Sequence, residues 1–168
     1  MPTLEEALAL HPELRLNVEI KQHTPAMEGA LWRELERLDA LDRVLVAAAH
    51  DPLVHRFRRL RARRLPTSPG VRGVLRFWLG VRTGLGRFDR YPFDALQVPA
   101  SEAGLTVVDR AFVDAAHAHG LHVHVWTIDE PAEMHRLLDL GVDGVMTDRP
   151  DLLRDVWRAR GLPWPTSA

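Results

Sequence analysis

The sequence predicts an α/β protein built around a parallel β-sheet. Segments with the two-residue period of a strand alternate with segments that have the period of a helix along the whole chain. Within residues 41–49, positions 44–49 (VLVAAA) form an unbroken apolar run, which is typical of a strand buried on both faces. The connections between segments are short, and this pattern favours parallel strands joined by right-handed crossovers.

The chain is expected to begin with a helix. Thr3 and Glu6 have capping-box spacing, in which each side chain bonds the backbone N–H of the other residue, and Leu4, Ala7 and Leu8 supply an apolar pattern. Further helices are predicted at residues 26–39, 109–119 and 148–160. Two more are predicted, one that begins at residue 52 and one that ends at residue 140.

Capping residues indicate where several of these helices begin and end. Asp51 is expected to be an N-cap, with Pro52 as the first helical residue, and Asp129 is expected to cap the helix that ends at residue 140. Gly120 and Gly141 are expected to end the two helices that precede them.

Six strands are predicted, at residues 14–22, 41–49, 71–79, 95–99, 121–127 and 144–147. Residues 80–93 contain glycines and a proline and are expected to form a long loop or a short irregular helix. In the fifth strand, alternation puts His122, His124 and Trp126 on one face.

Six β/α units indicate an incomplete barrel. A complete (β/α)8 TIM barrel has eight such units in about 250 residues, whereas this chain has 168 residues. We therefore predict a TIM-type barrel of about six parallel units whose opening units are absent, with residues 1–160 as the domain and 161–168 as a tail. No Gly-x-Gly-x-x-Gly motif follows a strand, so the fingerprint of a dinucleotide-binding fold is missing.

The first strand carries the most informative polar residues. Its two faces alternate, with Leu16, Val18 and Ile20 on one and Asn17, Glu19 and Lys21 on the other. Lys21 is the only lysine, and all the other basic residues are arginine. Two interpretations stay open: a solvent-facing strand with a Glu/Lys pair, or a polar row that faces a metal and an anion.

Charge and composition exclude several classes of protein. The formal net charge is −1, so no global field favours nucleic acid or an anionic membrane. The helix after residue 51 is rich in arginine (Arg56, Arg58, Arg59, Arg61, Arg63 and Arg64), but its apolar stripe makes these side chains a solvated face. We expect no nucleic-acid partner. No apolar run approaches the roughly 20 residues of a membrane span, and the absence of cysteine excludes thiolate metal sites.

Four segments, in this order and spacing, resemble the glycerophosphodiester phosphodiesterase family over essentially the whole chain. Residues 1–8 (MPTLEEAL) are similar to the Pro-Thr-Leu-Glu-Glu helix start of the family. Residues 16–21 (LNVEIK) resemble its NIEIK strand, and residues 125–129 (VWTID) resemble its VWTVN strand end. Residues 141–150 (GVDGVMTDRP) resemble its GVDGIITDRP segment.

The resemblance implies a reaction and three site residues. It implies metal-dependent hydrolysis of glycerophosphodiesters, with Mg or Ca, to glycerol 3-phosphate and an alcohol. Glu19 matches a metal ligand, Lys21 matches the lysine that neutralises the phosphate, and Trp126 matches the aromatic wall beside the substrate. In the family, metal and lysine offset the charge that builds on the phosphoryl oxygens, while two histidines transfer protons.

The chain also departs from the family pattern. The family opens with a His-Arg-Gly strand, a Glu-x-Asp strand and a His-Asp pair, and none of these precedes the opening segment here. They supply both catalytic histidines and most of the metal's carboxylates. We therefore expect the sequence to be cut short and the chain to be inactive alone. Residues 47–51 (AAAHD) also stand where the family usually has Ser-Phe and a polar residue.

Structural roles compete with functional ones at four positions. Plain core packing is the alternative for Trp126. For His124 a hydrogen-bonded interior histidine is preferred, for His50 a loop histidine, and for Asp148 a helix cap.

Two functions from different classes stay open. The chain belongs to an active phosphodiesterase, or it is a non-catalytic remnant that binds a phosphate compound or a partner chain. Open parallel sheets expose edges, so homo-oligomers through these edges are expected. We expect a small-molecule substrate and a cytoplasmic location.

Overall fold

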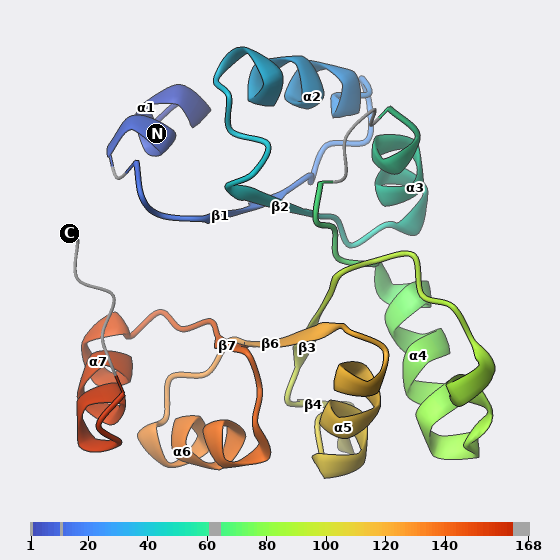
Figure 1. Cartoon of the computed structure of the whole chain (residues 1–168), viewed down its shortest axis with the longest axis vertical. Helices are drawn as coiled ribbons and strands as arrows, with labels where there is room; N and C mark the ends of the chain where they lie inside the picture. The colour runs from blue at the N-terminus through green and yellow to red at the C-terminus, as the bar shows by residue number, and fades with distance from the viewer. Residues whose placement is uncertain (1, 11, 61–64, 163–168) are drawn as a thin grey trace. The chain divides into compact units, whose positions relative to one another are not determined.

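The computed structural model describes residues 2–10, 12–60 and 65–162 (Figure 1). Residues 163–168 of the predicted tail lie outside the described part, as do Met1 and the predicted helical residues Arg61, Arg63 and Arg64. The chain divides into two compact units, Met1–Leu75 and Arg76–Ala168. Helix α4 (Val71–Thr83) begins in the first unit and continues into the second.

The first unit is built on two parallel strands. Its elements are α1 (Leu4–Leu10), β1 (Leu16–Glu19), α2 (Glu28–Arg37), β2 (Val44–Ala47) and α3 (Asp51–Leu60). Glu19 at the end of β1 is in register with Ala47 at the end of β2. Val46 also forms a parallel bridge with Thr67, so the segment after α3 extends this pairing.

The core of the first unit lies between these strands and the helices. Ile20 is 2% exposed and packs in one cluster with Leu35 of α2 and Phe57 of α3, and Leu16 and Val18 pack against the same cluster. Asn17, Glu19 and Lys21 are exposed. The predicted alternation is confirmed: the apolar face of β1 is covered by helices, and the polar row points away from them.

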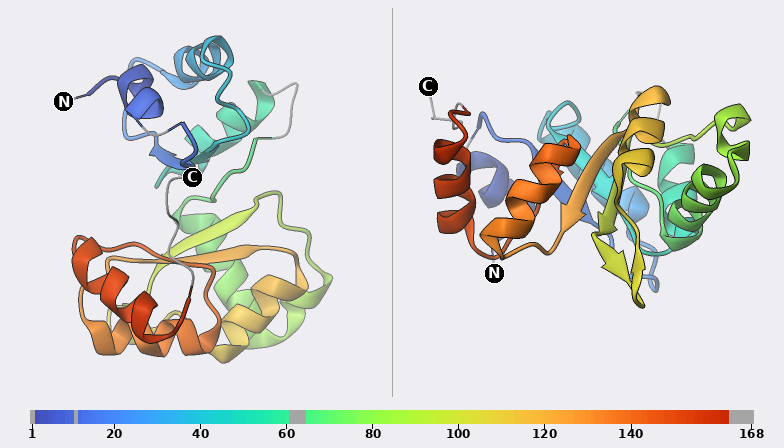
Figure 2. Two further views of the ribbon diagram at one scale, coloured as in Figure 1. Left: turned by 60° about the vertical axis from the view of Figure 1, so that its left-hand side comes forward. Right: turned by 90° about the horizontal axis from the view of Figure 1, so that it is seen from below.

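The second unit holds a three-stranded parallel sheet in the order β3-β6-β7. Its elements after α4 are η1 (Leu85–Phe88), β3 (Ala95–Pro99), β4 (Ser101–Glu102), β5 (Leu105–Thr106), α5 (Arg110–Ala118), β6 (His122–Trp126), α6 (Pro131–Leu140), β7 (Gly144–Val145) and α7 (Pro150–Ala159). Figure 2 shows α5 and α6 on the same side of this sheet.

The two faces of β6 differ as the sequence predicts. Val123 and Val125 are fully buried, whereas His122 and Trp126 are exposed and His124 is half-buried. The small antiparallel pair of β4 and β5 was not predicted. In the part of the chain that the structure describes, no helix is long and apolar enough to cross a membrane.

The prediction of a strand at residues 71–79 is wrong, because this stretch lies in helix α4. Phe77 is buried, while Val74, Trp78 and Val81 are half-buried, and this three- and four-residue spacing is that of a helix. The carboxylate of Asp51 accepts hydrogen bonds from the backbone N–H groups of Arg72 and Gly73, which fixes the helix start. The end of α4 and the 3-10 helix η1 fall within residues 80–93, where a loop or short irregular helix was expected.

Of the predicted caps, some are confirmed and some are wrong. Thr3 and Glu6 form the reciprocal capping box, at 2.8 Å and 3.2 Å. Gly120 and Gly141 adopt positive φ angles of 69° and 84° after α5 and α6. Other N-caps are corrected, because α3 already includes Asp51, α6 is preceded by Glu130 rather than Asp129, and α7 by Arg149 rather than Asp148.

Candidate functional site

Glu19 and Lys21 lie side by side at the carboxyl end of β1. The Nζ atom of Lys21 is 3.3 Å from Oε2 of Glu19, and the two side chains are 81% and 42% exposed, respectively. Both project from the face of the strand opposite the core, because Ile20 between them is buried in the core cluster. The carboxyl ends of parallel strands are where barrel enzymes place their chemistry. The ammonium of Lys21 is thus accessible from solution.

Two histidines meet beside this strand end. His23 follows Lys21, and His50 follows β2; their ring centroids are 4.1 Å apart with the ring planes at 72°. Parallel pairing of Glu19 with Ala47 brings the two strand ends together and so explains the contact. His50 was expected to be an ordinary loop histidine and His23 was not singled out. The available signal was that His23 continues the alternating positions of Glu19 and Lys21.

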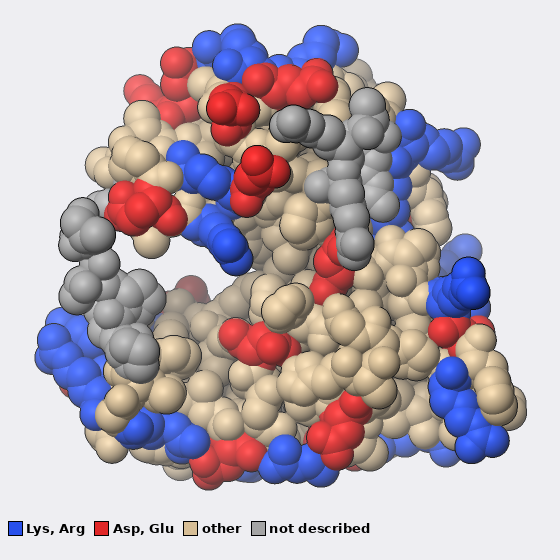
Figure 3. Space-filling view, viewed as in Figure 1, with Lys and Arg blue, Asp and Glu red and all other residues tan. Residues whose placement is uncertain are grey.

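The arginines of α3 include two with structural partners. Arg56 Nε donates to the buried carboxylate of Glu28 at 2.7 Å, and Arg58 Nε donates to Thr67 Oγ1 at 2.9 Å. Acidic and basic side chains are interspersed over the surface drawn in Figure 3. These contacts support the interpretation of the arginine-rich helix as a structural, solvated element.

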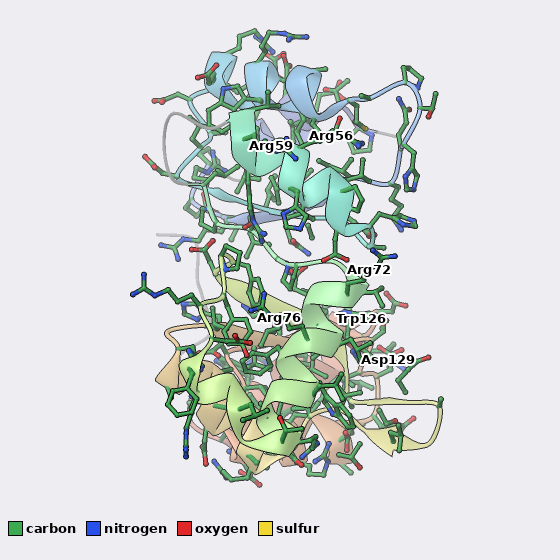
Figure 4. All side chains as sticks on the ribbon, turned by 90° about the vertical axis from the view of Figure 1, so that its right-hand side faces the viewer. Arg56, Arg59, Arg72, Arg76, Trp126 and Asp129 are labelled. Atoms are coloured by element: carbon green, nitrogen blue, oxygen red, sulfur yellow. The ribbon has the colours of Figure 1, made fainter. Side chains whose placement is uncertain are left out.

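Trp126 ends strand β6 in the second unit. It pairs in register with Pro99, the last residue of β3, and its side chain is 43% exposed (Figure 4). Plain core packing therefore does not describe this tryptophan. Its ring is placed at the carboxyl end of its strand, as Glu19 and Lys21 are at the end of theirs, and it offers an open aromatic surface.

His124 lies deeper on the same face as Trp126. Its Nδ1 is 3.4 Å from Nε2 of Gln97, its register partner on β3. A Cβ atom on Gly144 would lie 3.0 Å from the imidazole, so the glycine leaves room for the ring. Burial, and then the nearby His122, lower the pKa of His124. The structure thus bears out the preferred description of His124 as a hydrogen-bonded interior histidine.

Asp129 organises the chain after β6 and β7. Its Oδ1 accepts hydrogen bonds from Thr147 Oγ1 at 2.8 Å and from the backbone N–H of Asp148 at 2.9 Å. Thr147 Oγ1 in turn accepts from the backbone N–H of Arg149. This network ties the loop after β6 to the loop after β7. Asp148 contributes its backbone to the network and is not the N-cap of α7.

The described residues do not form a complete metal site. Among them, no group of three or more His, Asp or Glu side chains is arranged to hold an ion. Magnesium and calcium need about six oxygen ligands or more, and protein carboxylates usually supply several of them. Glu19 offers one such carboxylate, so the residues described here do not fit the ion by themselves.

The sequence profile of the glycerophosphoryl diester phosphodiesterase family matches residues 1–152. The chain belongs to this family. A Mycobacterium tuberculosis relative, named "Probable glycerophosphodiester phosphodiesterase 2", is 42% identical over 166 residues, which are 96% of this chain and 61% of the relative. The chain thus spans less than two thirds of that relative's length.

Solved structures share the fold of this phosphodiesterase family member. A Silicibacter pomeroyi structure with the same family name superposes with a TM-score of 0.75 at 24% identity, over 98% of this chain and 58% of that chain. A glycerophosphodiester phosphodiesterase structure from Parabacteroides distasonis superposes with a TM-score of 0.69 at 21% identity, over 95% of this chain and 65% of that chain. These neighbours are TIM barrels, so the predicted α/β barrel class is confirmed. Five parallel strands are present in the described residues, and not the predicted six.

Proposed function

We propose that the chain acts in the hydrolysis of glycerophosphodiesters to glycerol 3-phosphate and an alcohol. The observation that carries this proposal is the exposed ion pair of Glu19 and Lys21 at the carboxyl end of β1. Membership of the phosphodiesterase family gives the substrate class, and the one lysine of the chain gives the cation that meets the phosphate.

Lys21 would bind a phosphoryl oxygen and offset negative charge as it grows on the phosphate in the transition state. A compact ammonium on a flexible stem suits this task, and Glu19, 3.3 Å away, orients it at the strand end. Trp126 would pack its exposed ring against the apolar surface of the substrate.

A divalent cation, Mg or Ca, would add charge neutralisation when bound. Glu19 is the residue of this chain that would contact it, together with ligands beyond those described. Because the described residues do not form a full coordination sphere, we assign no step to the ion. We also assign the proton transfers to groups other than Glu19, Lys21 and Trp126. We propose that residues 1–168 alone do not turn over substrate.

A non-catalytic module that binds phosphate compounds is the second candidate, because the Glu19–Lys21 pair supports it equally. A chimera separates the two. Residues 1–168 would replace the matching segment of the Mycobacterium tuberculosis relative, which supplies the rest of the barrel. The chimera and the unaltered relative would be assayed with glycerophosphocholine and magnesium or calcium.

We expect the chimera to release glycerol 3-phosphate and Lys21→Gln to lower kcat/KM at least about a hundred-fold. The matched control is Arg15→Gln, which removes a cation at the amino end of the same strand and is expected to change little. A folded, inactive chimera beside an active relative would reject hydrolysis in favour of the binding module. Robust hydrolysis by residues 1–168 alone, lost on Glu19→Gln, would show that the acid and base are misplaced.

A further inference from the structure

Helix α4 presents an apolar stripe to solvent. Val71, Leu75 and Leu79 are spaced by four residues, and they are 68%, 53% and 47% exposed. Residues at this spacing lie on one side of a helix, and these three extend over about 12 Å. The opposite side of α4 is anchored by Phe77, which is buried against Phe112 and Tyr91. The stripe is thus the outer face of a helix whose inner face is already packed.

Exposed apolar side chains continue in the turn that follows. Leu85 and Phe88 of η1 are 67% and 75% exposed. The turn is held against α4, because Gly80 and Gly86 approach so closely that a Cβ on Gly86 would lie 2.8 Å from the backbone of Gly80. Single exposed hydrophobic residues are common, but five within one short segment are not.

The charge of this segment has one sign. Residues 71–88 contain four arginines and no acidic residue. Arg76 and Arg82 are paired with Asp89 and Asp109 from outside the segment. Arg72 and Arg87 have no acidic partner among the residues that the structure describes, and the Arg87 guanidinium lies 4.6 Å from the centre of the Phe88 ring. Figure 4 labels Arg72 and Arg76 along α4.

We propose that α4 and η1 dock this protein on an anionic lipid surface. An interfacial helix buries apolar side chains at the boundary of the acyl chains while its arginines meet lipid phosphates. A second copy of the chain is a poorer occupant of the stripe, since two such faces would bring arginine against arginine. Docking is independent of the phosphodiester chemistry, because it uses neither Glu19 nor Lys21.

Vesicle sedimentation tests the proposal with the whole chain, residues 1–168. Vesicles of equal parts phosphatidylcholine and phosphatidylglycerol are compared with vesicles of phosphatidylcholine alone. We expect binding to the anionic vesicles to be at least about ten-fold tighter, because of Arg72 and Arg87, and to weaken as salt is added. Equal binding to both vesicles, or no binding to either, would overturn the proposal.

Two variants locate the contact. The double substitution Leu75→Asp with Leu79→Asp is expected to weaken vesicle binding at least about ten-fold. Its matched control is Leu10→Asp with Leu105→Asp, at residues that are 74% and 59% exposed elsewhere, and this is expected to leave binding unchanged. Arg72→Gln with Arg87→Gln is expected to reduce binding to anionic vesicles only. The control Arg15→Gln with Arg33→Gln has the same net charge as that variant and should retain binding.

Circular dichroism and thermal unfolding establish that each variant is folded before binding is scored. Light scattering on the eluting protein then tests the competing occupant. If the unaltered chain is a dimer that Leu75→Asp with Leu79→Asp converts to a monomer, the stripe is a homotypic interface and the lipid proposal is wrong. Equal loss of vesicle binding in the Leu10 and Leu105 control would also contradict it.

Discussion

Asp51 caps a helix other than its own: its Oδ1 accepts from the backbone N–H of Gly73 at 3.0 Å, and its Oδ2 accepts from Arg72 at 3.0 Å. Asp51 is the first residue of α3, while Arg72 and Gly73 lie in the first turn of α4. Two backbone donors that no helical carbonyl can reach are satisfied by one carboxylate. Gly70 allows this approach, because a Cβ there would lie 2.5 Å from the Asp51 nitrogen.

Removing this cap should destabilise the protein. Asp51→Ala is expected to lower the free energy of unfolding by about 1–2 kcal/mol, since two N–H groups lose their partner. Asp51→Asn keeps an acceptor and should cost less. Urea unfolding followed by circular dichroism measures both. Asp114→Ala, at an exposed position of α5, is the control and should change stability by no more than about 0.5 kcal/mol; an Asp51→Ala loss as small as that would contradict the assignment.

The distribution of apolar residues explains why residues 71–79 were predicted as a strand. Apolar residues there are frequent on all sides, since the buried Phe77 and the exposed Leu75 and Leu79 are close in sequence. The helical stripe is therefore masked by hydrophobic residues that face solvent. The capping carboxylate comes from another helix, and no local pattern shows it. By contrast, β1, β2, β3, β6 and β7 all lie within predicted strands. Burial in β1 and β6 alternates with the period of a strand, and β2 is mostly buried, as expected of an apolar run.

The candidate site was only partly predictable for a related reason. Glu19 and Lys21 are two residues apart on one strand, so alternation alone places them on one face. His23 and His50 come from different strand ends, and their contact depends on the register of β1 with β2. Asp129 resembles a helix cap in sequence. Instead it accepts a hydrogen bond from Thr147, 18 residues later in the loop after β7. Contacts of this kind require the packed sheet.

The ion pair of Glu28 and Arg56 should contribute to stability at neutral pH. Glu28 is 3% exposed and Arg56 is 46% exposed. Burial raises the pKa of Glu28, but its backbone hydrogen bond and Arg56 outweigh this and hold the pKa below its ordinary value. Arg56→Ala is expected to cost about 1–2 kcal/mol in urea unfolding. Arg59→Ala on the same helix (Figure 4) is the matched control and should be nearly neutral.

The pH dependence of this effect has a defined sign. A carboxylate with a lowered pKa stabilises the fold above its unfolded pKa of about 4.3, and this contribution is lost as the pH falls through the folded value. The difference between Arg56→Ala and the unaltered chain should therefore shrink in acid. A difference that grows as the pH falls would contradict the role given to Glu28.

His124 should make stability depend on pH near neutrality. Its pKa is lowered by burial and by His122, so the unfolded chain takes up a proton before the folded chain does. Stability should consequently fall as the pH drops from about 6.5 toward the lowered folded pKa. His124→Asn should flatten the dependence of the unfolding free energy on pH in this window. His55→Asn, at an exposed position, should leave the slope unchanged, and equal slopes for all three proteins would reject the prediction.

Trp126 and Trp32 should respond differently to substitution. Trp32 is 7% exposed and contacts the Phe57 ring, with centroids 5.9 Å apart, so Trp32→Ala is expected to cost about 3–5 kcal/mol. Trp126 is 43% exposed, and Trp126→Ala should cost far less stability. In the chimera with the Mycobacterium tuberculosis relative, Trp126→Ala should raise KM by about ten-fold. A large stability loss with unchanged KM would make Trp126 a packing residue.

The central claim is that Lys21 meets a phosphate at the carboxyl end of β1, and the chain offers a direct probe of it. Lys21 is the only lysine, so reductive methylation with carbon-13 labels one side chain and the α-amino group while keeping their charges. Nuclear magnetic resonance would follow both signals during titration with glycerol 3-phosphate and, separately, with glycerol. We predict a saturable shift of the Lys21 signal with glycerol 3-phosphate, none with glycerol, and a weaker response in Glu19→Gln. A Lys21 signal that moves no more than that of the α-amino group would contradict the assigned site.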